Sequence, residues 1–129
     1  MKNDNPLAKE WFDLGEDDLR YAQLGFKDGE IFNLVCFHCQ QAVEKYLKGF
    51  LTLAAIEFPK THRLEKLISL AGQKDRKFLS FLNKVKYLDG FYIDTRYAGG
   101  VFESFHKNDA EKAIDIAKNI IKFIKNQIK

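Results

Sequence analysis

The sequence has few of the residues that break helices or stabilise secreted proteins. Among 129 residues there are two prolines, eight glycines, two cysteines and a single methionine. Two cysteines cannot build the disulfide framework of a small secreted protein, and the amino-terminal segment has no apolar stretch typical of a secretory signal. The longest apolar run, residues 50–56, is far shorter than the roughly 20 residues of a membrane span. We therefore expect a cytosolic protein that does not span a membrane.

The composition is that of a folded globular protein. Hydrophobic residues make up 46% of the chain and charged residues 30%, which excludes a disordered polypeptide. The length predicts a single domain over residues 1–129, large enough to bury one core. The net charge is only +3, so the protein as a whole is not a polycation for nucleic acid, although a local basic face remains open.

Apolar residues recur at helical spacing along most of the chain. A first helix is expected to begin at Pro6, with Asn5 as its cap, and to end at Asp28-Gly29. Its predicted apolar side consists of Leu7, Trp11, Leu14, Ala22 and Gly25. The charged residues of this helix lie mostly on the opposite side: Glu16, Asp17, Asp18 and Arg20. The others are expected over about 30–56, over 64–71 between a Thr61 cap and Gly72, over a short segment capped by Asp75, and over a last helix capped by Asn108 with Glu111 in capping-box position. The pattern predicts an all-α fold, an antiparallel up-and-down bundle of about five helices.

Residues 89–105 lack this periodicity and contain three glycines and five aromatic residues. A long irregular segment inside a compact helical protein is often functional, so we expect a functional loop there. It holds a dense polar group, Asp94, Arg96 and Tyr97. Arg96 offers a fork of donors to a phosphate or a carboxylate, and Tyr97 could stack on a base. The alternative is an Arg96–Asp94 pair that folds the loop onto the bundle.

The second and longest predicted helix is apolar over most of its circumference, which predicts the central helix of the bundle. Its narrow polar strip consists of Gln41, Glu44, Lys45, Lys48 and Thr52. His38 lies at the boundary of this strip, where it is either a packed residue or a general base or phosphate donor. His62, beside Thr61, is a second candidate ligand contact; the alternative is a local capping or surface role.

Cys36 and Cys39 flank His38 and resemble half of a metal site. A structural zinc site needs four ligands, and the chain has neither a second such cysteine pair nor a histidine pair at the right spacing. We therefore expect two small core residues, and we predict no metal and no cofactor.

The last predicted helix carries the whole net charge. Residues 106–129 contain six lysines against three acidic residues, and Lys118, Lys122, Lys125 and Lys129 lie at helical spacing. These lysines indicate either a solvated helix end, favoured by the helix dipole, or a surface that faces phosphate.

The order of these features resembles the HEPN family, the nucleotide-binding helical domains of prokaryotes and higher eukaryotes. The matching elements are Trp11 with Asp17-Asp18-Leu19 and Ala22, the run Gln40-Gln41-Ala42-Val43-Glu44-Lys45 followed by Lys48, the group Pro59, Thr61, His62 and Leu64, and Thr95-Arg96-Tyr97. They cover nearly the whole chain in order, and the Gln-Gln-Ala-x-Glu-Lys-x-x-Lys run is the most specific.

The resemblance implies a bundle of about five helices, usually a homodimer, that binds nucleotide or RNA in a groove near the dimer interface. Many relatives accompany a minimal nucleotidyltransferase, and in such pairs the HEPN partner can be a toxin ribonuclease. That ribonuclease branch carries an arginine followed after four to six residues by a histidine. Here Arg96 has no histidine in that window, and His106 lies ten positions on, so the resemblance does not supply the catalytic pair.

Three functions follow as hypotheses. The first is a binding module that presents nucleotide or RNA to a nucleotidyltransferase in a toxin–antitoxin-like pair. Its expected ligand contacts are Arg96, Tyr97, His38, Gln41, Lys45, Lys48 and His62. The second is a divergent, metal-independent endoribonuclease in which Arg96 acts with a histidine such as His38. The third is a purely structural partner of another protein.

Overall fold

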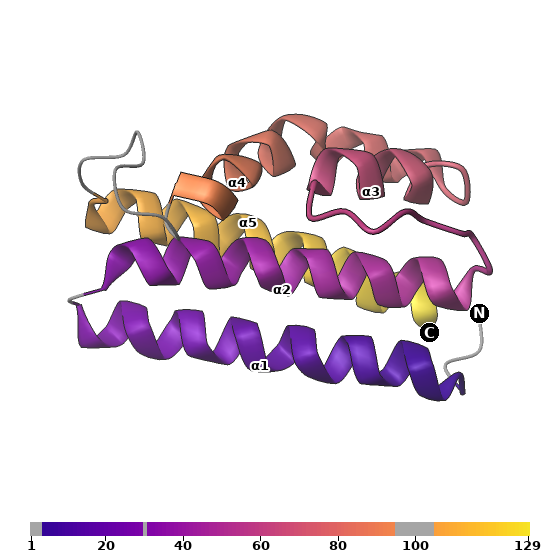
Figure 1. Ribbon diagram of the computed structural model, residues 1–129, viewed down its shortest axis with the longest axis horizontal. Coiled ribbons are helices and arrows are strands. Elements are labelled where there is room, and N and C mark those ends of the chain that lie inside the picture. Colours follow the sequence, from indigo (N-terminus) through magenta and orange to yellow (C-terminus); the bar gives the residue numbers. More distant parts are fainter. Residues whose placement is uncertain (1–3, 30, 95–104) are drawn as a thin grey trace.

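The predicted all-α bundle is confirmed by the computed structural model, which describes residues 4–29, 31–94 and 105–129. Five α-helices and one 3-10 helix account for its regular structure, with no strand in those residues: α1 (Pro6–Asp28), α2 (Phe32–Leu53), α3 (Leu64–Ala71), η1 (Arg76–Phe81), α4 (Leu82–Asp94) and α5 (Lys107–Ile128). Figure 1 shows α1, α2 and α5 as three long, nearly parallel rods, with α3 and α4 lying over α2 and α5. No described helix is both long and apolar enough to cross a membrane.

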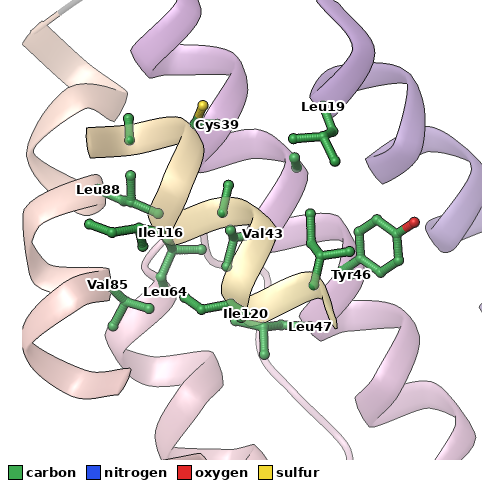
Figure 2. Packing of buried hydrophobic residues seen from close by; sticks show 14 of the residues in the cluster. Leu19, Cys39, Val43, Tyr46, Leu47, Leu64, Val85, Leu88, Ile116 and Ile120 are labelled. Atoms are coloured by element: carbon green, nitrogen blue, oxygen red, sulfur yellow. The ribbon is translucent and has the colours of Figure 1, made fainter. Parts of the chain in front are cut away.

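The central position predicted for the second helix is confirmed. α2 packs against α1, α3, α4 and α5, and its buried residues include Val43, Leu47 and Phe50. Figure 2 shows buried side chains from these elements converging around α2 and α5. A helix enclosed by four neighbours can be apolar over most of its circumference, which explains the wide apolar arc in the sequence.

The predicted apolar side of α1 is only half right. Leu7 and Leu14 are exposed, whereas Asp18, expected on the outer side, is 8% exposed. The buried side consists of Ala8, Gly15, Asp18, Leu19, Ala22 and Gly25. Small residues at three- and four-residue spacing let α1 approach α2 closely, so the packed face of this helix is its small-residue face and not its leucine face.

Several predicted ends moved by a few residues. α2 ends at Leu53 because Ala55 adopts a left-handed backbone (φ +57°) and the Ile56 N–H donates to the Leu51 carbonyl at 2.9 Å. The predicted Asp75 cap is confirmed by a 2.9 Å hydrogen bond from the Lys77 N–H.

Two further predictions around the irregular segment need correction. α4 continues to Asp94, so residues 89–94 are helical and not part of a loop; the rest of the expected loop, with Arg96 and Tyr97, lies outside the described residues. The cap of α5 is His106, whose N–H donates to Asp109 Oδ2 at 3.0 Å, and not Asn108 with Glu111.

Candidate functional site

One polar cluster joins α1 to α2. The His38 ring Nδ1 lies 2.9 Å from Asp18 Oδ1. The Lys45 ammonium donates to the other carboxylate oxygen, with 2.5 Å between Nζ and Asp18 Oδ2. His38 and Lys45 lie two helical turns apart on α2, so a single carboxylate on the facing helix holds both. We call these three residues the Asp18 cluster.

Asp18 fixes the chemistry that His38 can offer. An ionised carboxylate only accepts hydrogen bonds, so His38 Nδ1 carries the proton and Nε2 is the acceptor, or a second donor once the ring is protonated. The Tyr21 ring stacks on the imidazole, with centroids 5.4 Å apart and an interplanar angle of 18°. The His38 side chain is 29% exposed. A carboxylate-oriented, partly exposed imidazole is suited to donate to a phosphate or to move a proton.

Lys45 has a similar arrangement. Its ammonium has three donor positions, of which Asp18 takes one. The side chain is about a quarter exposed, at 23%. Gln41 lies on the same helix between His38 and Lys45 and is half-buried. The structure therefore places three of the predicted ligand residues on one side of α2, and two of them, His38 and Lys45, contact the Asp18 carboxylate.

A second cluster lies beside the first and is more deeply buried. Glu44 Oε2 pairs with Lys48 Nζ at 3.0 Å, and His62 Nδ1 lies 3.2 Å from both Glu44 oxygens. Glu44 and Lys48 are 3% and 7% exposed. Gln41 extends this second cluster, since its Nε2 donates to Gln40 Oε1 at 2.7 Å and lies 3.4 Å from Glu44 Oε1. The polar strip of α2 therefore contains a hydrogen-bonded group around Glu44 that is buried.

Lys48 is occupied within this second cluster. Besides pairing with Glu44, its ammonium lies 5.4 Å from the centroid of the Trp11 ring on α1. Cations are attracted to the face of an indole ring. Lys48 thus ties α2 to α1 from inside the bundle, whereas Lys45 reaches the partly exposed side.

The chain from His62 into the start of α3 is held in place from two helices, α2 and α4. Gln40 on α2 is fully buried and donates from Nε2 to the His62 carbonyl at 2.7 Å. Asp89 on α4 accepts from the backbone N–H groups of Leu64 and Glu65, at 2.8 and 3.1 Å, and so caps α3 in place of a local residue. Burial raises the pKa of Asp89, and these hydrogen bonds oppose that shift.

The two histidines pair with different carboxylates, His38 with Asp18 and His62 with Glu44. Whether Arg96 and Tyr97 approach either of them lies outside the described residues. The sequence reasoning missed Asp18, Gln40 and Asp89 as positioning residues. For Asp18 a signal existed, because it lies in helical register with Gly15, Ala22 and Gly25.

The cysteines are core residues, as expected. Cys36 and Cys39 are free thiols with no exposed surface. Burial raises the pKa of Cys36 to about 12 and shifts the pKa of Cys39 upward as well. Within the described part of the chain, no group of three histidine, cysteine or acidic side chains is arranged to hold a metal ion.

Comparison with known proteins gives a consistent result. The model of the HEPN domain family matches residues 8–127. A Methanocaldococcus jannaschii protein described as a putative toxin is 27% identical, over 95% of this chain and 88% of that protein. Among solved structures, ST0689, described as an archaeal HEPN homologue, superposes with a TM-score of 0.76 at 29% identity, over 95% of this chain and 98% of its own. TT1696 from Thermus thermophilus gives 0.75 at 29% identity, over 92% and 96%.

Proposed function

The chain belongs to the HEPN domain family, and we propose that it is a nucleotide- or RNA-binding module that works with a minimal nucleotidyltransferase in a toxin–antitoxin-like pair. The toxin relationship is supported by the archaeal relative described as a putative toxin. The partner is a proposal from family membership alone.

The observation that carries the proposal is the Asp18 cluster. Its carboxylate is buried behind His38 and Lys45, so both of these donors are held at fixed positions with part of each side chain exposed. Fixed donors lose little entropy when they bind a phosphate. In this proposal Lys45 and His38 contact phosphate and Gln41 adds a hydrogen bond.

The remaining predicted residues have supporting roles in the proposal. Arg96 would bind a second phosphate oxygen and Tyr97 would stack on the base. His62 would reach the ligand from the edge of the second cluster, where its side chain is 54% exposed. Lys48, paired with Glu44 and Trp11, would hold the helix rather than touch the ligand.

We propose that the module is a homodimer, and α1 offers a surface for it. Leu7, Leu14, Tyr21 and Leu24 are 44–66% exposed and follow one another at intervals of seven, seven and three residues. We call these four residues the α1 stripe. Several large apolar side chains exposed along one helix are typical of an interaction site. Because Tyr21 also stacks on His38, such a dimer would bring the interface up to the Asp18 cluster.

Calorimetry tests the binding function. ATP, GTP and a short single-stranded RNA are titrated into the wild-type protein and into Lys45→Met, which keeps the aliphatic stem and removes the charge. Lys27→Met, at an exposed position near the end of α1, is the control with the same change in net charge. Binding that is lost in Lys45→Met and kept in Lys27→Met supports the proposal. Absence of heat for all three ligands with a folded wild-type protein contradicts it.

A second candidate is a divergent endoribonuclease. The pairing of His38 with Asp18 favours it, because general bases are often oriented by a carboxylate in this way. It predicts metal-independent cleavage of single-stranded RNA that is lost in both His38→Ala and Arg96→Ala. If RNA stays intact with the purified protein in the presence of a chelator, the enzyme hypothesis fails and the binding module stands.

A further inference from the structure

The charged residues in the carboxyl-terminal half of α5 are all lysines. After Asp115, its only charged residues are Lys118, Lys122 and Lys125, followed by Lys129, and all four are exposed. Their spacing of four, three and four residues puts them on one line along the helix, about 5 Å apart. We call these four residues the α5 lysine stripe.

Little acidic charge opposes this stripe. Among the described residues, only Lys125 of the stripe has an acidic partner, Glu16, with 3.6 Å between Nζ and Oε1. By contrast α1 carries six acidic against three basic residues. The small net charge of the protein therefore hides an uneven distribution, with an acidic first helix and a basic end on the last.

A pocket adjoins the carboxyl-terminal end of the stripe. It has a volume of about 360 Å³ and is lined by Phe12 of α1, Tyr46 of α2, and Lys125, Ile128 and Lys129 at the end of α5. We call it the end pocket. Its volume is at the small end of the range for ligand sites, which suits a single flat ring system.

The aromatic walls of the end pocket are held rigidly. The Phe12 and Tyr46 rings lie 5.5 Å apart at 36°, and each packs on a glycine of the facing helix. A Cβ at Gly15 would lie 2.7 Å from the Tyr46 ring, and one at Gly49 would lie 2.6 Å from the Phe12 ring. The Tyr46 hydroxyl donates to Glu16 at 2.7 Å. Tyr46 is only 4% exposed and forms the floor of the pocket, so the half-buried Phe12 ring is the preformed surface on which a base can stack.

Lys125 belongs to both features, since it lines the end pocket and lies on the stripe. Its ammonium is 5.7 Å from the Tyr46 ring centroid. The Glu16 carboxylate beside it disfavours a phosphate inside the pocket. A ligand that fits both features has a neutral aromatic part in the pocket and negative charges spaced along the helix.

We propose that the end pocket and the α5 lysine stripe bind single-stranded nucleic acid, with one base stacked on Phe12 and the following phosphates along Lys125, Lys122 and Lys118. Base stacking beside a basic track is the usual way in which proteins hold single strands. The inference rests on the proposed function, because it gives the RNA of that function a second contact, separate from the Asp18 cluster.

The composition of this surface favours nucleic acid over an acidic protein. Protein interfaces are depleted of lysine and have an apolar centre. The exposed residues that alternate with the lysines are the polar Asn119 and Asn126, so this surface has no apolar centre.

Fluorescence anisotropy with a labelled single-stranded RNA of eight nucleotides tests the stripe. The variant is Lys118→Glu/Lys122→Glu, and the control is Lys60→Glu/Lys66→Glu, two exposed lysines near α3 with the same charge change. Each phosphate contact on a single strand contributes about 0.7 to the salt slope of the logarithm of the affinity, so we expect the variant to lower that slope by about 1.4. Equal slopes in the variant and the control would overturn the inference.

The end pocket is tested with the same RNA. Phe12→Leu removes one stacking wall, and we expect about fivefold weaker binding or more. Ile128→Trp, which fills the pocket from its rim at the end of α5, is the second variant and should weaken binding as well. Unchanged affinity in both folded variants overturns the pocket assignment, and tighter binding of poly-glutamate than of RNA identifies an acidic protein instead.

The outcomes separate this inference from the proposed function. If Lys45→Met abolishes RNA binding and the stripe variant has no effect, the inference fails and the proposed function stands. If the stripe variant alone removes RNA binding, the inference holds and the Asp18 cluster is not the RNA site. If ATP and GTP bind but RNA does not, the inference fails while nucleotide binding stands.

Discussion

Asp18 is the residue around which the candidate site is built. It is buried between α1 and α2 and neutralises Lys45 while orienting His38. Charges are buried in proteins when they are paired and hydrogen-bonded, and Asp18 meets both conditions. His38 and Lys45 were identifiable from the sequence because polar residues on a mostly apolar helix stand out. Asp18 was harder to identify, because the charged Asp17 and Arg20 lie close to it and its only signal was its helical register with small buried residues of α1.

Replacing Asp18 leaves a lysine and a histidine without their partner. We expect Asp18→Ala to lower the free energy of unfolding by about 1–3 kcal/mol, the usual cost of an unsatisfied buried polar group. The neighbouring Asp17 is the matched control, and Asp17→Ala should stay within about 0.5 kcal/mol. Urea denaturation followed by circular dichroism measures both; equal effects would show that Asp18 has no special structural role.

The buried thiols make a second prediction at this scale. Because burial raises the pKa of Cys36 to about 12, almost none of its reactive thiolate forms at a mildly alkaline pH. We expect native protein to react with iodoacetamide far more slowly than the same protein in urea. Equally rapid alkylation in both conditions would mean that the thiols are accessible and that the helices packed on α2 do not enclose them.

The periodicity of apolar residues predicted which segments form helices, but it did not predict where each helix begins and ends. The five α-helices were predictable because their apolar spacing persists over several turns. The start of α5 was wrong by two residues, since His106 and Asp109 form the cap and two alternative capping pairs overlap there. The α3 cap could not be read locally, because its acceptor, Asp89, comes from α4.

Glycines on α1 and α2 set the distance between these helices. Gly15→Ala would place a methyl group 2.7 Å from the Tyr46 ring and 3.2 Å from the Ala42 carbonyl. We expect it to lower stability by about 1–3 kcal/mol, as overpacking does. Gly90→Ala on α4 is the control, since a Cβ there meets nothing within 4 Å, and it should stabilise by up to about 1 kcal/mol. Thermal unfolding measures both, and stabilisation by Gly15→Ala would contradict the close packing.

In the whole molecule, α2 carries a polar strip with buried members, and α1 carries an apolar stripe that is exposed. The fold class followed from the sequence because helical patterns and family motifs agree. The exposure of the α1 stripe did not follow from the sequence, because its leucines have the spacing of a core face. The neighbouring helices decide which side of an amphipathic helix is buried.

The α1 stripe predicts self-association. We expect Leu14→Glu/Tyr21→Glu to be monomeric in light scattering coupled to gel filtration, whereas the wild type and the control Gln73→Glu/Ser80→Glu are dimers. Since the replaced side chains are exposed, the melting temperature of the monomeric unit should change little. A dimer that persists in Leu14→Glu/Tyr21→Glu would show that the interface lies outside the α1 stripe.

Nucleotide that binds where Asp18 holds His38 should change the surroundings of the His38 ring, which nuclear magnetic resonance of the imidazole protons measures. The chain has only three histidines, so the ring signals are few, and His38→Gln assigns the signal of interest. Adding ATP, GTP or the eight-nucleotide RNA to the wild-type protein should shift the His38 ring signals, with saturation at the dissociation constant found by calorimetry. His38 signals that stay unchanged at saturating ligand would show that nucleotide does not bind at the Asp18 cluster.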